Sequence, residues 1–226
     1  MGYKAYVLVI ILVFLVGCSA KGTNDLNGLT GRNGEKKVIT YFLSAENSLL
    51  PLENSKPRIG IISHVVLHFI SNVKHNPAEP YNLEDIKTIF IENGFSAHYL
   101  IGREGQVYRL VPEERIAFHA GPGFLSEFSA YENRLNDYSI GIELMAIGTR
   151  DEMLPILRSQ TYELVDPSLI GYTDAQYESL NTLLNDLHKR NPDIRRSRKH
   201  VVGHDEYAPV RKTDPGSLFD WSRIGY

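Results

Sequence analysis

The sequence lacks several features that mark common classes of protein. It has one cysteine among 226 residues, so no intramolecular disulfide can form and the fold must be stabilised mainly by its core. Its formal net charge is -3, whereas a nucleic-acid-binding domain is usually clearly basic. It has no internal repeat and no apolar run of the about 20 residues that a transmembrane helix needs. With 42% hydrophobic and 23% charged residues, the composition is typical of a globular protein.

The longest apolar run lies near the N-terminus, from Ala5 to Val16, after the positive charge of Lys4. A charged residue, a short apolar segment and small residues at its end are typical of an export signal. The segment Leu15–Cys18 (LVGC) also resembles the lipobox of bacterial lipoproteins. This resemblance implies cleavage before Cys18 and several acyl chains on that cysteine, which are enough for stable membrane anchoring. The alternatives are a plain signal peptide or an uncleaved signal anchor.

Three regions follow from this pattern. Residues 1–17 are expected to be a lipoprotein signal peptide, residues 18–45 the lipidated Cys18 with its tether, and residues 46–226 one folded domain. The tether prediction rests on residues 19–37, which are rich in Gly, Asn, Thr and Lys and have no periodicity. The lipobox resemblance places the protein in the bacterial cell envelope. Ser19 is compatible with an anchor in the outer membrane, facing the periplasm.

Periodicity predicts an α/β fold in which helices flank a central mixed β-sheet. Helices are expected over 82–93, with Asn82 as N-cap and Gly94 as its end, and over 173–190, where Thr173 and Gln176 can form a capping box. Strands are expected over residues 63–70, 98–101, 106–110, 139–146 and 201–202, with a hairpin turn at 102–105. Residues 148–172 have no recognisable pattern and are expected to form a loop on the surface.

The C-terminal segment from Gly203 to Gly216 combines a histidine, a lysine and an aspartate. Pro215 favours an extended backbone at Asp214, and in an extended run Lys212 and Asp214 point to the same side. His204 and Asp214 are two potential metal ligands with a positive charge nearby. A catalytic zinc usually has three protein ligands and one open position, so a third ligand must come from elsewhere in the chain.

Two histidines of the first long strand are candidates for that third ligand. His68 lies in an apolar strand, where a buried imidazole needs a polar partner. His64 lies on the same face of the strand, so spacing alone leaves it as a rival. Each of them can also be a core or surface histidine without a metal.

Two further positions are candidates for catalysis or binding. In the strand at 139–146, Glu143 shares a face with Gly141, and a glycine there clears space beside the carboxylate, as a substrate cleft would require. A carboxylate in a partly dry cleft near a metal is a candidate general base, although a strand carboxylate can also simply face water. His119 lies on a glycine-rich turn, and such loops often carry functional residues.

Five segments, taken together and in this order, resemble the zinc-dependent N-acetylmuramoyl-L-alanine amidases of type 2. That family is related to phage lysozyme-type amidases and to peptidoglycan recognition proteins. The matching segments are 65–68 (VVLH), 96–101 (SAHYLI), 110–112 with 118–121 (LVP and FHAG), 134–143 (RLNDYSIGIE) and 203–216 (GHDEYAPVRKTDPG).

This resemblance implies a role for each candidate residue. It implies a zinc site in a surface cleft, formed by His68, His204 and Asp214, and it favours His68 over His64. It implies Glu143 and Lys212 as the catalytic pair, and it places His119 and Asn136 near the substrate. Residues 46–226 would then be the amidase catalytic domain.

The activity that the resemblance implies is hydrolysis of the amide bond between the N-acetylmuramoyl lactyl group and the L-alanine of peptidoglycan stem peptides. The expected partners are peptidoglycan or a muropeptide and, through the lipid anchor, a membrane. No nucleic acid is expected, and the protein is expected to be a monomer. The alternative function is a lipoprotein that binds muropeptides without cleaving them, as members of this fold do when they lack a metal ligand.

Overall fold

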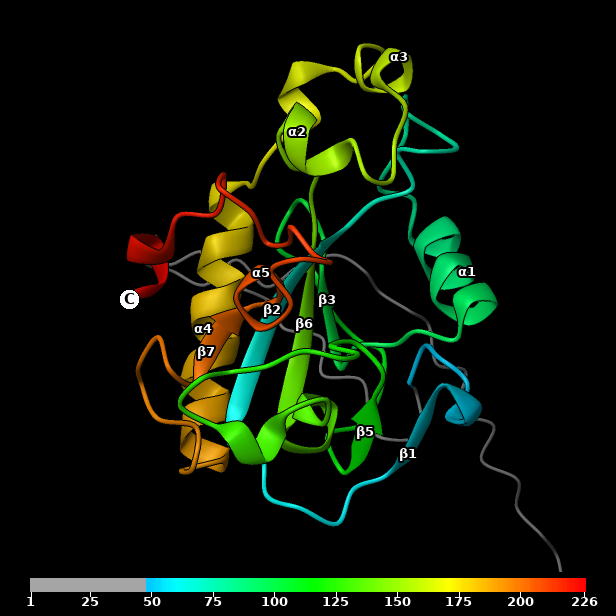
Figure 1. Cartoon of the computed structure of the whole chain (residues 1–226). Coiled ribbons are helices and arrows are strands. Elements are labelled where there is room, and N and C mark those ends of the chain that lie inside the picture. The colour runs from blue at the N-terminus through cyan, green and yellow to red at the C-terminus, as the bar shows by residue number, and fades with distance from the viewer. Residues whose placement is uncertain (1–47) are drawn as a thin grey trace, which may run out of the picture. The chain divides into compact units, whose positions relative to one another are not determined.

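A five-stranded mixed sheet with the order β4-β3-β6-β2-β7 forms the centre of the fold (Figure 1). The computed structural model describes residues 48–226. Strands β3, β6, β2 and β7 are parallel, and β4 is added antiparallel at one edge. The strands are β2 (His64–Ile70), β3 (Tyr99–Ile101), β4 (Val107–Arg109), β6 (Ser139–Met145) and β7 (Val201–Gly203). The predicted mixed sheet and its hairpin are therefore confirmed.

A second, two-stranded sheet pairs β1 (Ser55–Pro57) antiparallel with β5 (Arg115–Ala117). The sequence analysis did not predict it. Strands of three residues are too short to show an alternation of apolar and polar side chains, and a proline within a run argues against a strand.

Two long helices occupy the predicted places, α1 (Leu83–Asn93) and α4 (Asp174–Arg190). The Asn82 side chain accepts hydrogen bonds from the backbone of the first turn of α1, and Gly94 ends that helix in the left-handed conformation. Thr173 and Gln176 form the predicted capping box of α4. The shorter helices are α2 (Arg150–Met153), α3 (Ser159–Tyr162), α5 (His204–Tyr207) and the 3-10 turns η2 (Leu52–Asn54), η3 (Ser129–Tyr131), η4 (Leu135–Tyr138), η5 (Pro167–Leu169) and η6 (Trp221–Ile224).

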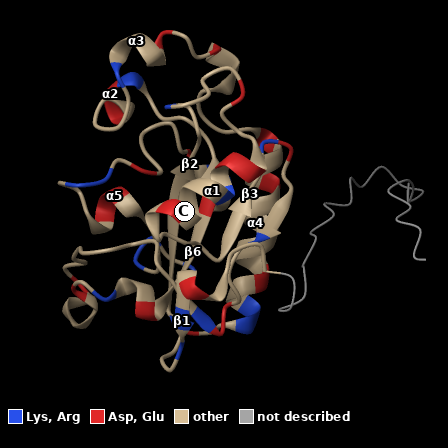
Figure 2. Cartoon of the chain, turned by 90° about the vertical axis from the view of Figure 1, so that its right-hand side faces the viewer, with Lys and Arg blue, Asp and Glu red and all other residues tan. Residues whose placement is uncertain are grey.

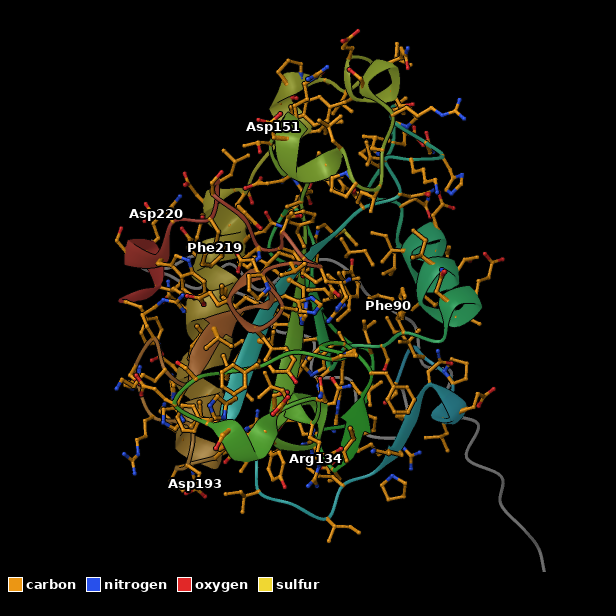
Figure 3. The ribbon with its side chains drawn as sticks, viewed as in Figure 1. Phe90, Arg134, Asp151, Asp193, Phe219 and Asp220 are labelled. Carbon is orange, nitrogen blue, oxygen red and sulfur yellow. The ribbon has the colours of Figure 1, made fainter. Side chains whose placement is uncertain are left out.

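The two long helices cover opposite faces of the sheet. Helix α4 packs its leucines on the face formed by Val65, Leu67, Ile140 and Ile142. Helix α1 packs Phe90 and Ile86 on the other face, against Leu100 and Met145. Figure 3 shows Phe90 on α1 and Phe219 beside α4, on either side of the strands. Side chains alternate between the two faces along a strand. The strand residues next to those that pack against α4 therefore point to the opposite face, which α1 covers. His68 and Glu143 are two of these.

Residues 148–172 were expected to form a surface loop, but they contain short helices and form a small folded unit above the sheet (Figure 1). Helices α2 and α3 and the turn η5 surround a separate apolar cluster. Its buried members are Val73, Ile147, Met153, Leu157 and Val165. Helices of four residues contain about one turn, which is too short for a helical period to be seen in the sequence.

The predicted signal peptide (1–17), Cys18 and the whole predicted tether (18–45) lie outside the described residues, so those predictions stay predictions. Within residues 48–226, no helix has the length and apolar character needed to span a bilayer. Acidic and basic residues are interspersed over this part of the domain (Figure 2).

Candidate active site

Three side chains from separate parts of the chain meet on the α1 side of the sheet, toward the carboxyl ends of the parallel strands. His68 lies on β2, and β7 pairs with β2 so that Gly203 is opposite Leu67. His204, the residue after Gly203, therefore comes beside His68. Asp214 lies in the loop that follows α5. All three side chains are largely shielded from solvent, with His68 and His204 each 2% exposed.

The atoms that meet are all metal-ligand atoms. His68 Nδ1 lies 3.0 Å from His204 Nδ1 and 2.8 Å from Asp214 Oδ2, and His204 Nδ1 lies 3.0 Å from Asp214 Oδ2. Ligands about 2.0–2.1 Å from a tetrahedral zinc ion would be roughly 3.3 Å apart. The observed separations are within a few tenths of an ångström of that value, so a small outward movement would admit the ion. Among the described residues, His68, His204 and Asp214 are the one set of potential metal-ligand side chains close enough together to hold a metal ion.

The hydrogen bond made by the far side of the His204 ring gives that ring the protonation pattern of a metal ligand. His204 Nε2 lies 2.8 Å from the carbonyl oxygen of Ala120, which can only accept, so Nε2 carries the proton. In a neutral imidazole the lone pair is then on Nδ1, the atom that faces Asp214. Metal-binding histidines commonly donate their other ring nitrogen to a carbonyl in this way.

A chain of hydrogen bonds gives His68 the same pattern. Ser139 Oγ donates to the carbonyl oxygen of Leu135 at 2.6 Å, so it can only accept from His119 Nε2, 3.2 Å away. A neutral His119 then has its lone pair on Nδ1, which accepts from His68 Nε2 at 3.1 Å. His68 Nδ1 is therefore left without a proton. Three lone pairs thus converge with no hydrogen between them, an arrangement that a cation stabilises.

The pKa shifts agree with neutral imidazoles and an ionised carboxylate. Burial, and then the neighbouring His204, lower the pKa of His68 to about 4. Burial, together with His68 and His98, lowers the pKa of His119 well below 6.5. Burial alone would raise the pKa of Asp214, but the contacts with His204 and His68 outweigh it and hold this pKa far below its ordinary value. At neutral pH His68 therefore offers a neutral nitrogen and Asp214 an anionic oxygen, both of which are ligands that zinc accepts.

Glu143 lies on β6 directly opposite His68 in the parallel pairing of the two strands. Its side chain is buried, and its Oε2 has no hydrogen-bond partner within residues 48–226. Burial, and then the charge of Asp214, raise its pKa well above 4.5, while the positive charge of Lys212 acts in the opposite direction. A buried, unpartnered carboxyl beside a metal-ligand cluster is available to exchange protons with a bound molecule.

Lys212 lies two residues before Asp214 and is partly exposed. Its backbone N–H donates to the carbonyl oxygen of Ala208 and closes a turn over residues 208–211, while residues 212–214 are in neither a helix nor a turn. The Lys212 charge still acts on both Glu143 and His68. Lys212 and Asp214 therefore both lie near enough to Glu143 for their charges to act on it.

Gly141 does not have the function expected for it. A Cβ atom at this position would lie 2.5 Å from Cγ of the His119 ring, so the space above Gly141 is filled by His119. The glycine thus makes room for His119, which accepts a hydrogen bond from His68. The sequence correctly indicated a missing side chain on the face of Glu143, but not which residue uses the space.

The Gly141→Ala variant should therefore bind zinc about 10-fold more weakly, because the added methyl displaces His119 and breaks its hydrogen bond to His68. Competition with a fluorescent zinc chelator measures this dissociation constant. Gly60→Ala is the matched control, because its Cβ would lie 3.4 Å or more from its neighbours. Equal zinc affinity for G141A and G60A would contradict the role of His119.

The structure also shows the surroundings of two other candidates, His64 and Asn136. His64 stacks on His200 with ring centroids 4.8 Å apart, and its Nδ1 contacts Ser63 Oγ. Four residues along β2 put it roughly 13 Å from His68, too far to share a metal. The Asn136 side-chain oxygen accepts from the backbone N–H groups of His119 and Ala120 at 3.1 and 2.8 Å. Asn136 therefore shapes the loop that carries His119.

The comparison with protein families decides the identity of the domain. A family model described as N-acetylmuramoyl-L-alanine amidase (Amidase_2) matches residues 55–217, which include every residue of the site. The chain belongs to the type 2 N-acetylmuramoyl-L-alanine amidase family. The suspected family is thus confirmed.

Two curated members of this family are similar in sequence. The chain is 40% identical over 129 residues to the 1,6-anhydro-N-acetylmuramyl-L-alanine amidase AmpD of Escherichia coli (strain K12), covering 57% of this chain and 56% of AmpD. It is 27% identical over 205 residues to the N-acetylmuramoyl-L-alanine amidase AmiD of the same organism, covering 87% of this chain and 63% of AmiD. The matched part thus spans about half the length of the AmpD proteins.

Solved structures of this amidase family share the fold. The crystal structure of a selenomethionine derivative of AmpD matches with a TM-score of 0.54 and 30% identity, over 80% of this chain and 93% of that one. The complex of AmiD from E. coli with anhydro-N-acetylmuramic acid-L-Ala-D-gamma-Glu-L-Lys matches with a TM-score of 0.51 and 26% identity, over 72% and 56% of the chains. The single α/β domain with a mixed central sheet is common to them.

The sequence analysis of this amidase domain missed Ser139 and the carbonyl groups of Ala120 and Leu135. Ser139 is the first residue of β6, the strand that carries Glu143, but nothing in the sequence connects it with His119, twenty residues away. Backbone carbonyls have no sequence signal at all, because every residue has one.

Proposed function

We propose that this chain is a zinc-dependent amidase that hydrolyses the bond between the N-acetylmuramoyl lactyl group and the L-alanine of peptidoglycan stem peptides. The observation that carries the proposal is the convergence of three ligand atoms, from His68, His204 and Asp214, beside the buried carboxyl of Glu143. Membership of the amidase family supports it. The name of AmpD and the substrate bound in the AmiD complex further support an anhydro-muropeptide as the substrate.

The proposed reaction divides the work among the residues of the site. A zinc ion held by His68, His204 and Asp214 would supply Lewis-acid polarisation of the scissile carbonyl and would make water more acidic. Glu143 removes a proton from the attacking water and delivers it to the leaving alanine nitrogen, for which its raised pKa is suited. Lys212 places its positive charge near the oxygen that becomes negative when the carbonyl is attacked.

His119 and Asn136 were predicted to lie near the substrate. Both ring nitrogens of His119 contact other side chains, and the Asn136 oxygen accepts from the His119 loop. We therefore propose that the two residues act first on the shape of the site, and direct contact with the substrate stays a prediction.

The proposed cellular setting rests on the sequence alone. Lipidation of Cys18 would hold the amidase in the bacterial envelope, with the outer membrane and its periplasmic face as the proposed place. There it would meet peptidoglycan or released muropeptides. We propose that it acts as a monomer and without nucleic acid.

The proposal is tested with the full chain purified in detergent and incubated with anhydro-N-acetylmuramic acid-L-Ala-D-gamma-Glu-L-Lys. We expect mass spectrometry to detect the free tripeptide starting at alanine, and expect a zinc chelator to stop its release. Binding of the muropeptide without cleavage would replace the proposal with the non-catalytic binding function. Cleavage that survives complete removal of metal would refute the role of zinc.

A further inference from the structure

The loop that carries Asp214 is held by residues that have no part in the proposed chemistry. They belong to residues 148–172, here called the excursion, which rises above the sheet (Figure 1). The held segment, residues 213–217, is called the ligand loop. The two segments are separated by more than forty residues in sequence, so the tertiary fold alone brings them together.

Glu152 of α2 makes the principal contacts between the two segments. Its Oε1 accepts the backbone N–H of Ser217 at 2.6 Å, and its backbone carbonyl accepts the Thr213 hydroxyl at 3.1 Å. Its Oε2 accepts the backbone N–H of Thr149 at 2.7 Å, which closes the capping box of α2. One side chain therefore both caps a helix of the excursion and binds the ligand loop. Figure 3 marks the neighbouring Asp151 on this helix.

Two further residues make this contact close. Tyr172, at the other end of the excursion, donates its hydroxyl to the carbonyl oxygen of Pro215 at 2.7 Å. Gly216 has a φ of 76° and no side chain, and a Cβ there would lie 2.8 Å from the Glu152 carboxyl. A side chain at position 216 would push Glu152 away. Residues on both sides of Asp214 are thus bonded to the excursion.

The excursion is itself anchored to the rest of the domain. Arg103, in the turn between β3 and β4, donates to the carbonyl oxygens of Gly171 and Met145. Tyr81 donates to the carbonyl oxygen of Leu169 at 2.5 Å. The buried cluster around Met153 and Leu157 includes Val73, which follows β2, the strand of His68. Glu152 and Tyr172 are therefore fixed relative to the sheet that carries the other ligand.

We propose that the excursion is a clamp that fixes Asp214 in the position needed for metal binding, with Glu152 and Tyr172 as its positioning residues. This inference rests on the proposed zinc site. Within residues 48–226, the backbone of Asp214 itself makes one hydrogen bond, in which its carbonyl oxygen accepts the Asp205 N–H at 2.7 Å. Without the clamp, binding would have to order the loop, and the ordering entropy would weaken the affinity for metal.

Zinc affinity, measured on the full chain in detergent after removal of metal, tests the clamp. Glu152→Gln keeps the size of the side chain but replaces one acceptor oxygen by an NH₂ group, which cannot accept an N–H. We expect E152Q to weaken zinc binding about 10-fold, within the range for residues that orient metal ligands. Tyr172→Phe removes the hydroxyl and keeps the ring packing, and we expect a loss of a few-fold by the same reasoning.

The matched control is Glu163→Gln, an exposed glutamate of the same excursion that lies outside the contacts between α2 and the ligand loop described above. It should bind zinc like the wild type. Far-ultraviolet circular dichroism establishes that each metal-free variant is folded. A merely structural effect would lower the unfolding temperature without changing the zinc affinity of the folded protein. Wild-type affinity in folded E152Q and Y172F would overturn the clamp. A wild-type chain that binds no zinc would instead refute the proposed metal site.

Discussion

Replacing Glu143 by glutamine should reduce the turnover of the muropeptide by about 100- to 10,000-fold, the range typical of a general acid–base group. Glutamine fills the same space on β6 but cannot take a proton from water at neutral pH. The zinc content of the variant should stay at the wild-type level, because Glu143 is not among the three converging ligands. Turnover is measured by release of the tripeptide and zinc by atomic absorption.

The same variant should change how stability depends on pH in the metal-free protein. The pKa of Glu143 is raised in the folded state, so the folded protein holds this proton more tightly than the unfolded chain does. Its contribution to stability is therefore full below the unfolded pKa of about 4.3 and is lost as the pH rises toward the folded pKa. In E143Q this loss should disappear, and thermal unfolding near pH 7 should occur at an equal or higher temperature than in the wild type.

Either of two results would contradict the assignment of Glu143. Turnover in E143Q within a few-fold of the wild type would mean that another group exchanges the proton. Loss of zinc from E143Q would mean that the carboxylate belongs to the metal site, and the fall in activity would then have a different cause.

Replacing Asp214 by alanine should abolish both tight zinc binding and activity. The variant removes the one anionic ligand and leaves two imidazoles, His68 and His204, whose Nδ1 atoms lie 3.0 Å apart. A catalytic zinc site usually needs three protein ligands. The wild type should also be stabilised against heat by zinc, by about 2.7 kcal/mol when free zinc is 100 times the dissociation constant, and D214A should lose this stabilisation.

Zinc-dependent shifts of the unfolding temperature, followed by calorimetry, measure this effect. Asp193→Ala is a suitable control because Asp193, labelled in Figure 3, is exposed and is not one of the three converging ligands. It should keep the full zinc-dependent shift. A full shift in D214A would exclude Asp214 as a ligand and would require a carboxylate elsewhere, with Glu143 the first to examine.

The positions of the long helices and strands could be predicted because they depend on residues close together in the sequence. Helix α1 begins after Asn82 and ends at Gly94, and α4 begins at the Thr173–Gln176 capping box. Each of these signals is a set of hydrogen bonds between residues a few positions apart. Strands β2 and β6 are each seven residues long, which is enough for the alternation of side chains between the two faces to show in the sequence. The short strands β1 and β5 and the four-residue helices of the excursion lie below that length.

The sequence by itself determined the kinds of groups available: two histidines and an aspartate as ligands, a strand glutamate and a nearby lysine. Spacing alone left His64 and His68 equivalent, since a spacing of four puts both on one face of a strand, and only the family resemblance favoured His68. The pairing of β2 with β7 and β6 supplies the physical reason for His68, because it brings His204 and Glu143 to that residue. The partner of Gly141, the hydrogen-bond chain to Leu135 and the hold of Glu152 on the ligand loop also depend on contacts between distant segments. No local pattern encodes such contacts, because they exist only once the chain has packed.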